Sequence, residues 1–289
     1  MSAQRLSLAP LTVRPASEFS LKILTDIYNR ARIDYIIPMP MSVRRMEEYL
    51  RFYDVDLSRS AVAEAGGELL GVGMLGVRPD RTWITRLGVI PAKRRRGVGR
   101  ALMRHFIRES RNLGVSRIIL EVIKGNVAAH RLFHRYDFRE QRELLILRRP
   151  PIMPRFDAPA YEAELLYGEA VFALLEKRTT TPSWLDDLPS LRKVGGMHAL
   201  RVTLRNGGCG WIAFHLQPYQ LSRLVIEVEE GDNEAVTRAL LHSLHTRYPR
   251  HDTKLENLPA DSHYRQSLEA VGYFVAFTRI EMVKWLSYA

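Results

Sequence analysis

The chain of 289 residues has one cysteine, Cys209, so no disulfide can form within it. This excludes the small secreted scaffolds that disulfides hold together and fits a reducing compartment. The chain also lacks a long apolar run, because charged residues interrupt every apolar stretch, and we therefore expect no membrane-spanning helix. A basic segment followed by an apolar one is missing at the N-terminus, so we expect no secretory signal and a cytoplasmic location.

Positive charge is concentrated in the first half of the chain. The net charge is +11, yet residues 1–150 contain 28 Lys and Arg against 15 Asp and Glu, whereas residues 151–289 contain 15 against 17. The first half thus has an excess of 13 positive charges, and the second is slightly acidic. A surface of this kind attracts a polyanion, either a multiply phosphorylated cofactor or a nucleic acid backbone.

The length suits two domains of about 140 residues each. Residues 148–160 contain four prolines, each of which removes a backbone donor and disfavours helix in the residue before it. This composition indicates an extended connection. We therefore predict a first domain over 1–149, a proline-rich linker over 150–160 and a second domain over 161–289.

Strands and helices alternate in the first domain. Ser42 is a good helix N-cap, and Gly66-Gly67 suits a tight hairpin turn. The resulting order, β-α-α-β-β-β-α-β-α-β, predicts an α/β fold in which helices cover a mixed sheet. We expect strands at 11–14, at 61–76 with the hairpin inside it, and at 83–90, 118–123 and 144–147, and helices at 17–31, 42–53, from 97 onward and at 126–136.

The second domain repeats this plan faintly. Short segments of the first half recur 135 to 138 residues later, and similar offsets at separated places favour a duplicated fold. The matching segments are 85–89 with 222–226, 100–102 with 238–240, 120–121 with 255–256, and 137–138 with 272–273.

The stretch 87–102 carries the clearest chemical signal. An apolar strand leads into a basic, glycine-containing turn that opens directly into a helix, with five cationic side chains between Lys93 and Arg100. Glycine lets the backbone approach a ligand closely, and the free N–H groups of a first helical turn favour a pyrophosphate. The stretch is not a Walker loop, because it lacks the downstream Gly-Lys-Ser/Thr. It is not a dinucleotide fingerprint either, because the third glycine is absent. A solvated basic turn without a ligand is the alternative.

Two motifs resemble those of one superfamily, the GCN5-related N-acetyltransferases (GNAT). The loop resembles the signature Arg/Gln-x-x-Gly-x-Gly/Ala, here Arg94-x-x-Gly97-x-Gly99-x-Ala101. A later stretch is similar to the second motif of the family. It reads Leu120-Glu121-Val122, followed by Asn126-x-x-Ala129-x-x-Leu132-Phe133-x-x-x-Asp137-Phe138. The resemblance covers about residues 11–148. The second half has acids at 232–234 in place of the basic loop and resembles a degenerate copy, so we expect two GNAT folds in tandem.

The resemblance implies an N-acetyltransferase that passes an acetyl group from acetyl-CoA directly to an amine on a small molecule or peptide. Backbone N–H groups of the loop would bind the coenzyme A pyrophosphate, and the preceding strand, usually bulged in this family, would pair with the pantetheine arm. Asn126 would contact that arm, although capping its own helix is an equal alternative. The predicted cofactor contacts are Leu87, Gly88, Val89, Arg94, Arg95, Arg96, Gly97, Val98, Gly99, Arg100, Ala101, Asn126, Ala129 and Phe133.

The acid and base that this family often uses are missing from their usual positions. Phe133 replaces a tyrosine that protonates the leaving thiolate, and apolar residues or Thr85 stand where an acidic base often lies. Tyr136, about 60° further round the helix, is the remaining candidate acid. Because a thiol has a pKa of about 8.5, it can leave with little help, so we hypothesise an amine acceptor of low pKa or a proton path through water.

Three other interpretations stay open. The chain could bind acyl-CoA as a sensor without turnover or, less favoured, bind nucleic acid through its basic half. His130 and His134 are spaced i, i+4 and could share a metal, but no matching Cys, Asp or Glu cluster follows, so we expect none. The sequence does not indicate the acceptor, the acyl chain length or the oligomeric state.

Overall fold

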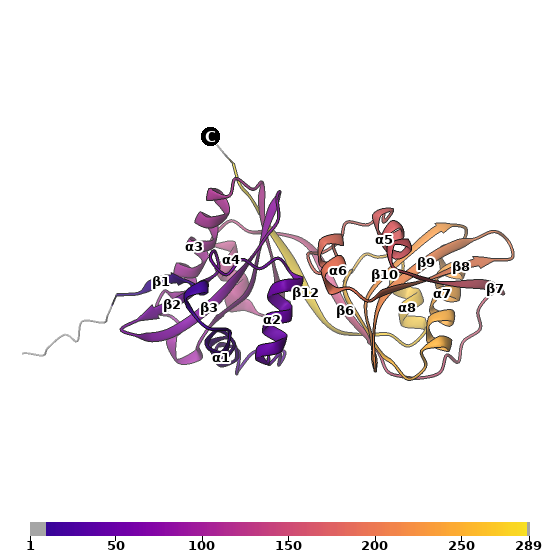
Figure 1. The fold of residues 1–289 in the computed structure, drawn as a ribbon, viewed down its shortest axis with the longest axis horizontal. Coiled ribbons are helices and arrows are strands. Elements are labelled where there is room, and N and C mark those ends of the chain that lie inside the picture. Colours follow the sequence, from indigo (N-terminus) through magenta and orange to yellow (C-terminus); the bar gives the residue numbers. More distant parts are fainter. Residues whose placement is uncertain (1–9, 288–289) are drawn as a thin grey trace, which may run out of the picture. The chain divides into compact units, whose positions relative to one another are not determined.

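The computed structural model describes residues 10–287, and the chain divides into two compact units (Figure 1). Among the described residues, unit 1 comprises 10–141 and 281–287, and unit 2 comprises 142–280. Residues 142–149 thus group with unit 2 and residues 281–287 with unit 1. Residues 150–160 contain no helix or strand. No helix within 10–287 is both long and apolar enough to cross a membrane.

Unit 1 is built on a sheet with the neighbour order β1-β2-β3-β4-β5-β12. Strands β1 to β4 pair antiparallel in sequence, whereas β4 and β5 run parallel. Its elements are β1 (Thr12–Pro15), the 3-10 turn η1 (Ala16–Glu18), α1 (Leu21–Ala31), α2 (Val43–Phe52), β2 (Ala61–Ala65), β3 (Glu68–Val77), β4 (Arg81–Val89), η2 (Pro91–Lys93), α3 (Val98–Asn112), β5 (Arg117–Ile123), α4 (Val127–His134), the start of β6 (Arg139–Arg149) and the end of β12 (Phe274–Trp285).

The predicted elements of this unit are present, with two corrections to their bounds. Helix α1 begins after Ser20 rather than at residue 17, because the Ser20 hydroxyl accepts a hydrogen bond from the Ile23 amide at 3.3 Å and caps the helix. The strand expected at 144–147 is longer and runs over β6.

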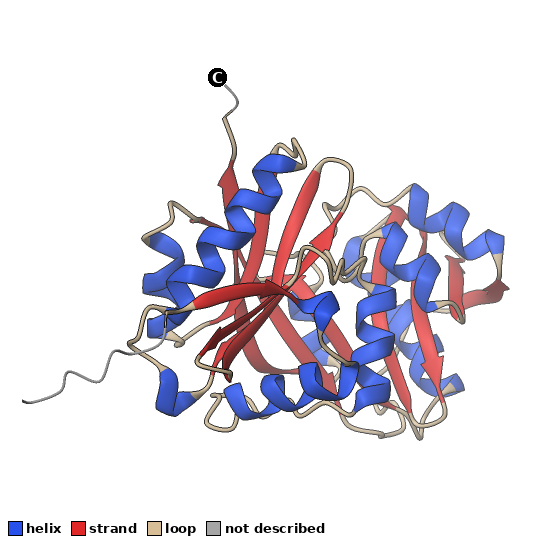
Figure 2. Cartoon of the chain, turned by 60° about the vertical axis from the view of Figure 1, so that its left-hand side comes forward, coloured by secondary structure: helices blue, strands red, loops and turns tan. Residues whose placement is uncertain are grey.

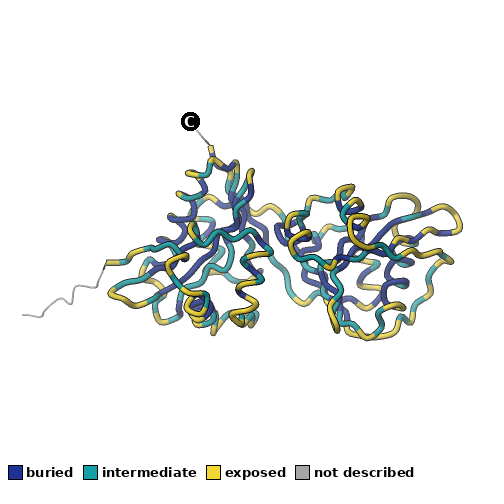
Figure 3. Tube along the Cα trace, in the orientation of Figure 1, coloured by how far each residue is buried: buried dark blue, intermediate teal, exposed yellow. Residues whose placement is uncertain are grey.

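Helices α1 and α2 pack on the sheet of unit 1 through a buried apolar cluster. Figure 3 shows these central strands as mostly buried, and both helices place large side chains against them. The contacts recur every three or four residues along α1, as expected for an amphipathic helix. The cluster contains Ala16, Leu24, Ile27, Tyr28, Met46, Val62, Val72 and Met74.

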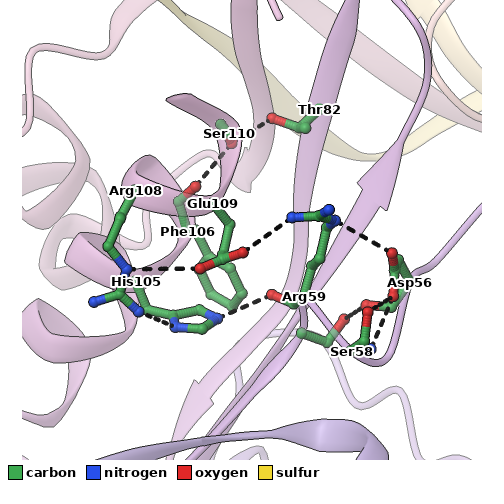
Figure 4. A network of polar contacts seen from close by, with 10 residues as sticks. Asp56, Ser58, Arg59, Thr82, His105, Phe106, Arg108, Glu109 and Ser110 are labelled. Atoms are coloured by element: carbon green, nitrogen blue, oxygen red, sulfur yellow. Dashed lines mark hydrogen bonds and ion pairs between the residues drawn. The ribbon is translucent and has the colours of Figure 1, made fainter. Parts of the chain in front are cut away.

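Helix α3 is fixed by a polar network near its C-terminal half (Figure 4). Arg59 bridges Glu109 of the helix, 3.1 Å away, and Asp56, 3.5 Å away. The Ser110 hydroxyl lies 2.7 Å from the Thr82 hydroxyl of β4, and both are buried. Buried hydrogen bonds of this kind define one position for a helix, so the C-terminal half of α3 is held in one place against β4.

Unit 2 has the neighbour order β12-β6-β11-β10-β9-β8-β7, and helices flank its strands (Figure 2). Helices α7 and α8 contribute to one buried cluster, and α5 and α6 to another. The elements are the greater part of β6, β7 (Tyr161–Tyr167), α5 (Glu169–Glu176), α6 (Leu188–Val194), β8 (Met197–Leu204), β9 (Cys209–Gln217), β10 (Gln220–Glu230), α7 (Asn233–Arg247), β11 (Asp252–Pro259), α8 (Arg265–Ala270) and the start of β12.

The two units share backbone details that confirm a duplicated fold. Arg86 in β4 and Arg223 in β10 both adopt positive φ angles, 53° and 54°, each where the pairing register shifts. The helices that follow, α3 and α7, both contain 15 residues. Non-glycine residues rarely adopt such φ values, so their recurrence 137 residues apart supports the repeat seen in the sequence.

Candidate functional site

Strand β4 carries a bulge and then separates from β5. Pairing with β3 passes from Val72↔Gly88 to Met74↔Thr85, so β4 has one extra residue there, next to Arg86. Pairing with β5 ends at Ile84. A bulge bends its strand and interrupts the ladder. Within the described chain, the edge of β4 toward β5 is therefore left without a strand partner over residues 85–89.

The last residues of β4 have one edge in use and one open. Gly88 and Val89 pair with Val72 and Gly71 of β3 on the first edge. Gly88 also allows α1 to pack closely, because a Cβ on it would lie 2.9 Å from the Cβ of Ala31. The open edge offers backbone N–H and C=O groups that an extended ligand could pair with as an added strand.

The loop after β4 turns through two left-handed residues. Arg95 has a φ of 63° and Gly97 a φ of 82°. A left-handed non-glycine residue costs about 1 kcal/mol or more, so the flanking structure must hold Arg95 in place. Alternation of right- and left-handed residues turns successive N–H groups toward one side and forms an anion-binding concavity.

The amides at the start of α3 are open. Gly97 occupies the N-cap and has no side chain that could accept a hydrogen bond. The first bond of the helix runs from the Ala101 amide to the Gly97 carbonyl, at 2.9 Å. Among residues 10–287, the amides of residues 95–100 have no acceptor. These donors and the positive end of the helix dipole together favour an anion.

Two of the five cations in this segment are paired with acids. The Arg94 guanidinium donates to both carboxylate oxygens of Asp34, at 2.6 and 2.7 Å, and to the Val89 carbonyl at 3.1 Å. This contact lowers the pKa of Asp34. Lys93 lies 2.7 Å from Glu68 and lowers the pKa of that carboxyl. Both pairs anchor the loop on either side, so the Arg94 side chain supports the loop rather than extending toward the open amides.

The other three cations surround the open amides. Arg95, Arg96 and Arg100 are exposed, and no acid of the described chain forms an ion pair with any of them. Guanidinium groups bind phosphate oxygens with charge-assisted hydrogen bonds. The first turn of α3 therefore has unpaired donors and uncompensated positive charge at one place.

Helix α4 lies beside this turn. A Cβ on Gly99 would lie 3.2 Å from Leu132, so the glycine allows close packing of α3 and α4. The Asn126 side chain accepts from the Ala129 amide at 3.2 Å, which makes Asn126 the cap of α4. Tyr136 donates its hydroxyl proton to the Arg100 carbonyl at 3.1 Å. Three other residues predicted to contact the cofactor have buried side chains, namely Val98, Ala101 and Phe133.

Polar and aromatic side chains gather on the α1 and α2 side of the β4 bulge. The Tyr49 hydroxyl is 2.6 Å from Thr85 Oγ1, and burial raises the pKa of Tyr49, which keeps the phenol protonated. Arg86 lies over the Tyr49 ring at 4.1 Å and donates to the Tyr28 hydroxyl at 3.2 Å. Arg32 lies 3.4 Å from the same hydroxyl. The open amides and this cluster of side chains thus both lie next to the unpaired part of β4.

Glu121 is a carboxylate that the sequence analysis missed as a candidate base. It directly follows Leu120, the last residue of β5 that pairs with β4. Thr85 and Glu121 each follow the paired residues Ile84 and Leu120, so side-chain alternation places both on the face of the sheet where Tyr49 contacts Thr85. One acid inside the apolar run 118–123 was a usable signal, because buried strands rarely contain an unneeded charge.

The corresponding place in unit 2 is closed. Asp232 is the N-cap of α7, and its carboxylate accepts from the Ala235 amide at 2.8 Å. Glu234 adds a second acid to the first turn. The donors that are open in α3 are thus partly occupied in α7 by the chain's own carboxylate, and negative charge repels a pyrophosphate.

One further cluster lies at the other end of α4. His130 and His134 face Glu140 of β6, and ligand atoms of the three lie within 4.8 Å of one another. The local sequence pattern shows no acid that completes the histidine pair, because Glu140 follows the helix and does not share its i, i+4 spacing. The turn between α4 and β6 brings it into reach.

Comparisons with known proteins agree with this geometry. Residues 24–138 match the model of the acetyltransferase (GNAT) family. A GCN5-related N-acetyltransferase from Sphaerobacter thermophilus is similar in structure, with a TM-score of 0.68, 16% identity and 95% of each chain covered. A tandem GNAT protein from the clavulanic acid biosynthesis pathway has a TM-score of 0.67 and 16% identity over 97% of this chain and 100% of its own. No curated protein matches this chain.

Proposed function

Because residues 24–138 match the acetyltransferase (GNAT) family and the whole chain has the fold of a tandem GNAT protein, we propose that unit 1 binds acetyl-CoA and transfers its acetyl group to an amine. The observation that carries the proposal is the uncapped start of α3, where open amides and three unpaired guanidinium groups lie together. The chemistry of this donor set fits a pyrophosphate. The open edge of β4 fits the amides of a pantetheine arm.

The coenzyme supplies an activated acyl thioester, and the residues of unit 1 do the rest. The loop amides with Arg96 and Arg100 would hold the pyrophosphate, and Arg94 holds the loop through Asp34. The unpaired edge of β4 would pair with the pantetheine arm and so orient the acyl end. Orientation alone contributes strongly to such a transfer, because it converts a bimolecular step into an intramolecular one.

Glu121 is our candidate for the base that takes the proton from the amine. The amine nitrogen forms a bond to the carbonyl carbon, the carbon–sulfur bond breaks, and the electron pair leaves with sulfur. A carboxylate beside the nitrogen receives its proton, directly or through a water. Tyr49, kept protonated by burial, can donate a hydrogen bond on the same side of the sheet. Glu121 thereby offers the proton path that the sequence left open.

An assay of thiol release with a panel of amines tests this function. Wild-type protein is incubated with acetyl-CoA and with α-amines, lysine-like amines and polyamines, and free coenzyme A is measured. We expect amine-dependent release that disappears in the Arg96→Glu/Arg100→Glu variant. An α-amine of pKa about 8 should react well below the pH that a lysine-like amine of about 10.4 needs.

Two outcomes would contradict the proposal in different ways. Acetyl-CoA binding without thiol release for any amine would favour the sensor interpretation. Absence of acetyl-CoA binding, together with salt-dependent binding to RNA or DNA, would favour the nucleic-acid interpretation.

A further inference from the structure

Three side chains of unit 1 converge at the C-terminal end of α4. His130 Nε2 lies 2.9 Å and His134 Nε2 lies 3.6 Å from the same oxygen, Oε1 of Glu140. The two imidazole rings have centroids 4.5 Å apart and are perpendicular. Spacing of i, i+4 places both rings on one face of the helix, and β6 brings the carboxylate to that face.

The contact between His130 and Glu140 is not a satisfied hydrogen bond. His130 Nε2 is shielded from solvent and has no hydrogen-bond partner among the described residues, although Oε1 is within 2.9 Å. If the imidazole carries its proton on Nδ1, the lone pair of Nε2 and an anionic oxygen face each other and repel. A cation between these two atoms would turn the repulsion into coordination.

We propose that His130, His134 and Glu140 form a binding site for one divalent zinc ion. Two imidazole nitrogens and one carboxylate oxygen are a donor set that zinc uses in sites with an open fourth position. Tetrahedral bonds of about 2.0–2.2 Å need donor atoms that lie about 3.3–3.5 Å apart. The two histidine–carboxylate separations, 2.9 and 3.6 Å, are of this order, so rotations of these partly exposed side chains can complete the geometry.

The surroundings leave a coordination position open. The side chains of His130, His134 and Glu140 are 29%, 38% and 49% exposed, so water can reach a bound ion. Imidazole ligands select zinc over magnesium, which prefers six oxygen ligands. The ion would connect the last turn of α4 to the start of β6 and so stabilise unit 1.

Calorimetric titration of zinc into untagged, metal-free full-length protein tests the site. We expect one zinc ion per chain at this site, and a weakening of at least about tenfold in His134→Ala and in Glu140→Gln, since each removes one of three ligands. His263→Ala, which removes an exposed histidine of unit 2, is the matched control and should bind zinc as the wild type does. Excess magnesium should not compete.

A second measurement does not depend on any variant. Cobalt added to the wild-type protein should give the visible absorption of a tetrahedral ion, and zinc should remove it. Thermal unfolding should shift upward with zinc in the wild type and not in Glu140→Gln. Failure of the wild type to bind zinc, or equal binding by Glu140→Gln, would overturn the proposal and leave the three side chains as an ion pair only. Both results are independent of transferase activity.

Discussion

At the scale of single residues, the proposed chemistry depends on one carboxylate. Glu121 stands where β4 and β5 stop pairing, and its charge reaches the Tyr49 hydroxyl that contacts Thr85. A base at this point needs to take only one proton, because a thiolate leaves near neutral pH with little assistance. The absence of a tyrosine at position 133 is therefore compatible with turnover.

Replacement of this base should slow the reaction without affecting the coenzyme. In Glu121→Gln we expect kcat to fall about a hundredfold, the usual contribution of a positioned acid or base. The Kd for acetyl-CoA should stay the same, because the proposed pyrophosphate site lies at the start of α3. Steady-state rates over a range of pH measure this, and the loss should shrink at high pH, where the amine deprotonates by itself. Glu47→Gln, an exposed carboxyl on α2, is the matched control, and equal rates in both variants would contradict the assignment.

A buried histidine of unit 2, His245, should make the free energy of unfolding depend on pH. Burial, assisted by the charge of Arg149, lowers the pKa of His245 to about 3. The unfolded chain takes up this proton below a pKa of about 6.5, whereas the folded chain does not until pH is near 3, so stability falls as pH drops through this window. At pH 5.5 the loss should be about 1 kcal/mol.

Urea unfolding of the full-length chain between neutral pH and pH 5 measures that loss. His245→Gln retains a partner for the Tyr273 hydroxyl, which His245 contacts at 3.0 Å, and should lose this part of the pH dependence. An unchanged slope in the variant would show that other groups control the acid sensitivity.

At the scale of elements, two equally long helices differ in how they begin. Both α3 and α7 contain 15 residues and follow a bulged strand. Helix α3 begins at Gly97 without a cap, and α7 begins at Asp232 with one. A cap stabilises its helix, whereas an open N-terminus leaves donors for a ligand. The stability that α3 forgoes is consistent with a binding role.

Loss of the Asp232 cap of α7 should lower the free energy of unfolding without changing the affinity for acetyl-CoA. We expect Asp232→Ala to reduce the free energy of unfolding by about 1 kcal/mol, a typical value for a helix N-cap. Acetyl-CoA affinity should be unchanged, since the proposed coenzyme site lies in unit 1. Urea unfolding and calorimetry together measure both effects. Glu234→Ala, in the first turn of the same helix, serves as the control. It should reduce the free energy of unfolding less, because Glu234 makes no capping bond.

Local chemistry made most elements predictable from the sequence, and long-range contacts made some features unpredictable. Ser42 and the Gly66-Gly67 pair act through neighbouring residues, so the α2 start and the hairpin followed from the sequence. The pairing of Arg94 with Asp34 joins residues 60 apart, and the approach of Glu140 to His130 depends on how β6 leaves α4. Neither contact has a local sequence pattern that predicts it.

At the scale of the whole molecule, the charge asymmetry corresponds to the proposed division of roles between the units. The excess positive charge lies in residues 1–150, which include the open loop, and the slightly acidic remainder includes the capped one. Residues 142–149 group with unit 2 and residues 281–287 with unit 1. Sequence patterns could not reveal this grouping, because linker composition marks where the chain is extended and not which core each strand joins.

Calorimetric titration of acetyl-CoA tests the central claim most directly. We predict one binding site per wild-type chain, a Kd at least about tenfold weaker in Arg96→Glu/Arg100→Glu, and wild-type affinity in Arg111→Glu, at the far end of α3. Charge at that end is separated from the loop by more than the screening length of about 8 Å in physiological salt. Two sites per chain, no binding by the wild type, or equal affinity in the double variant would contradict the account.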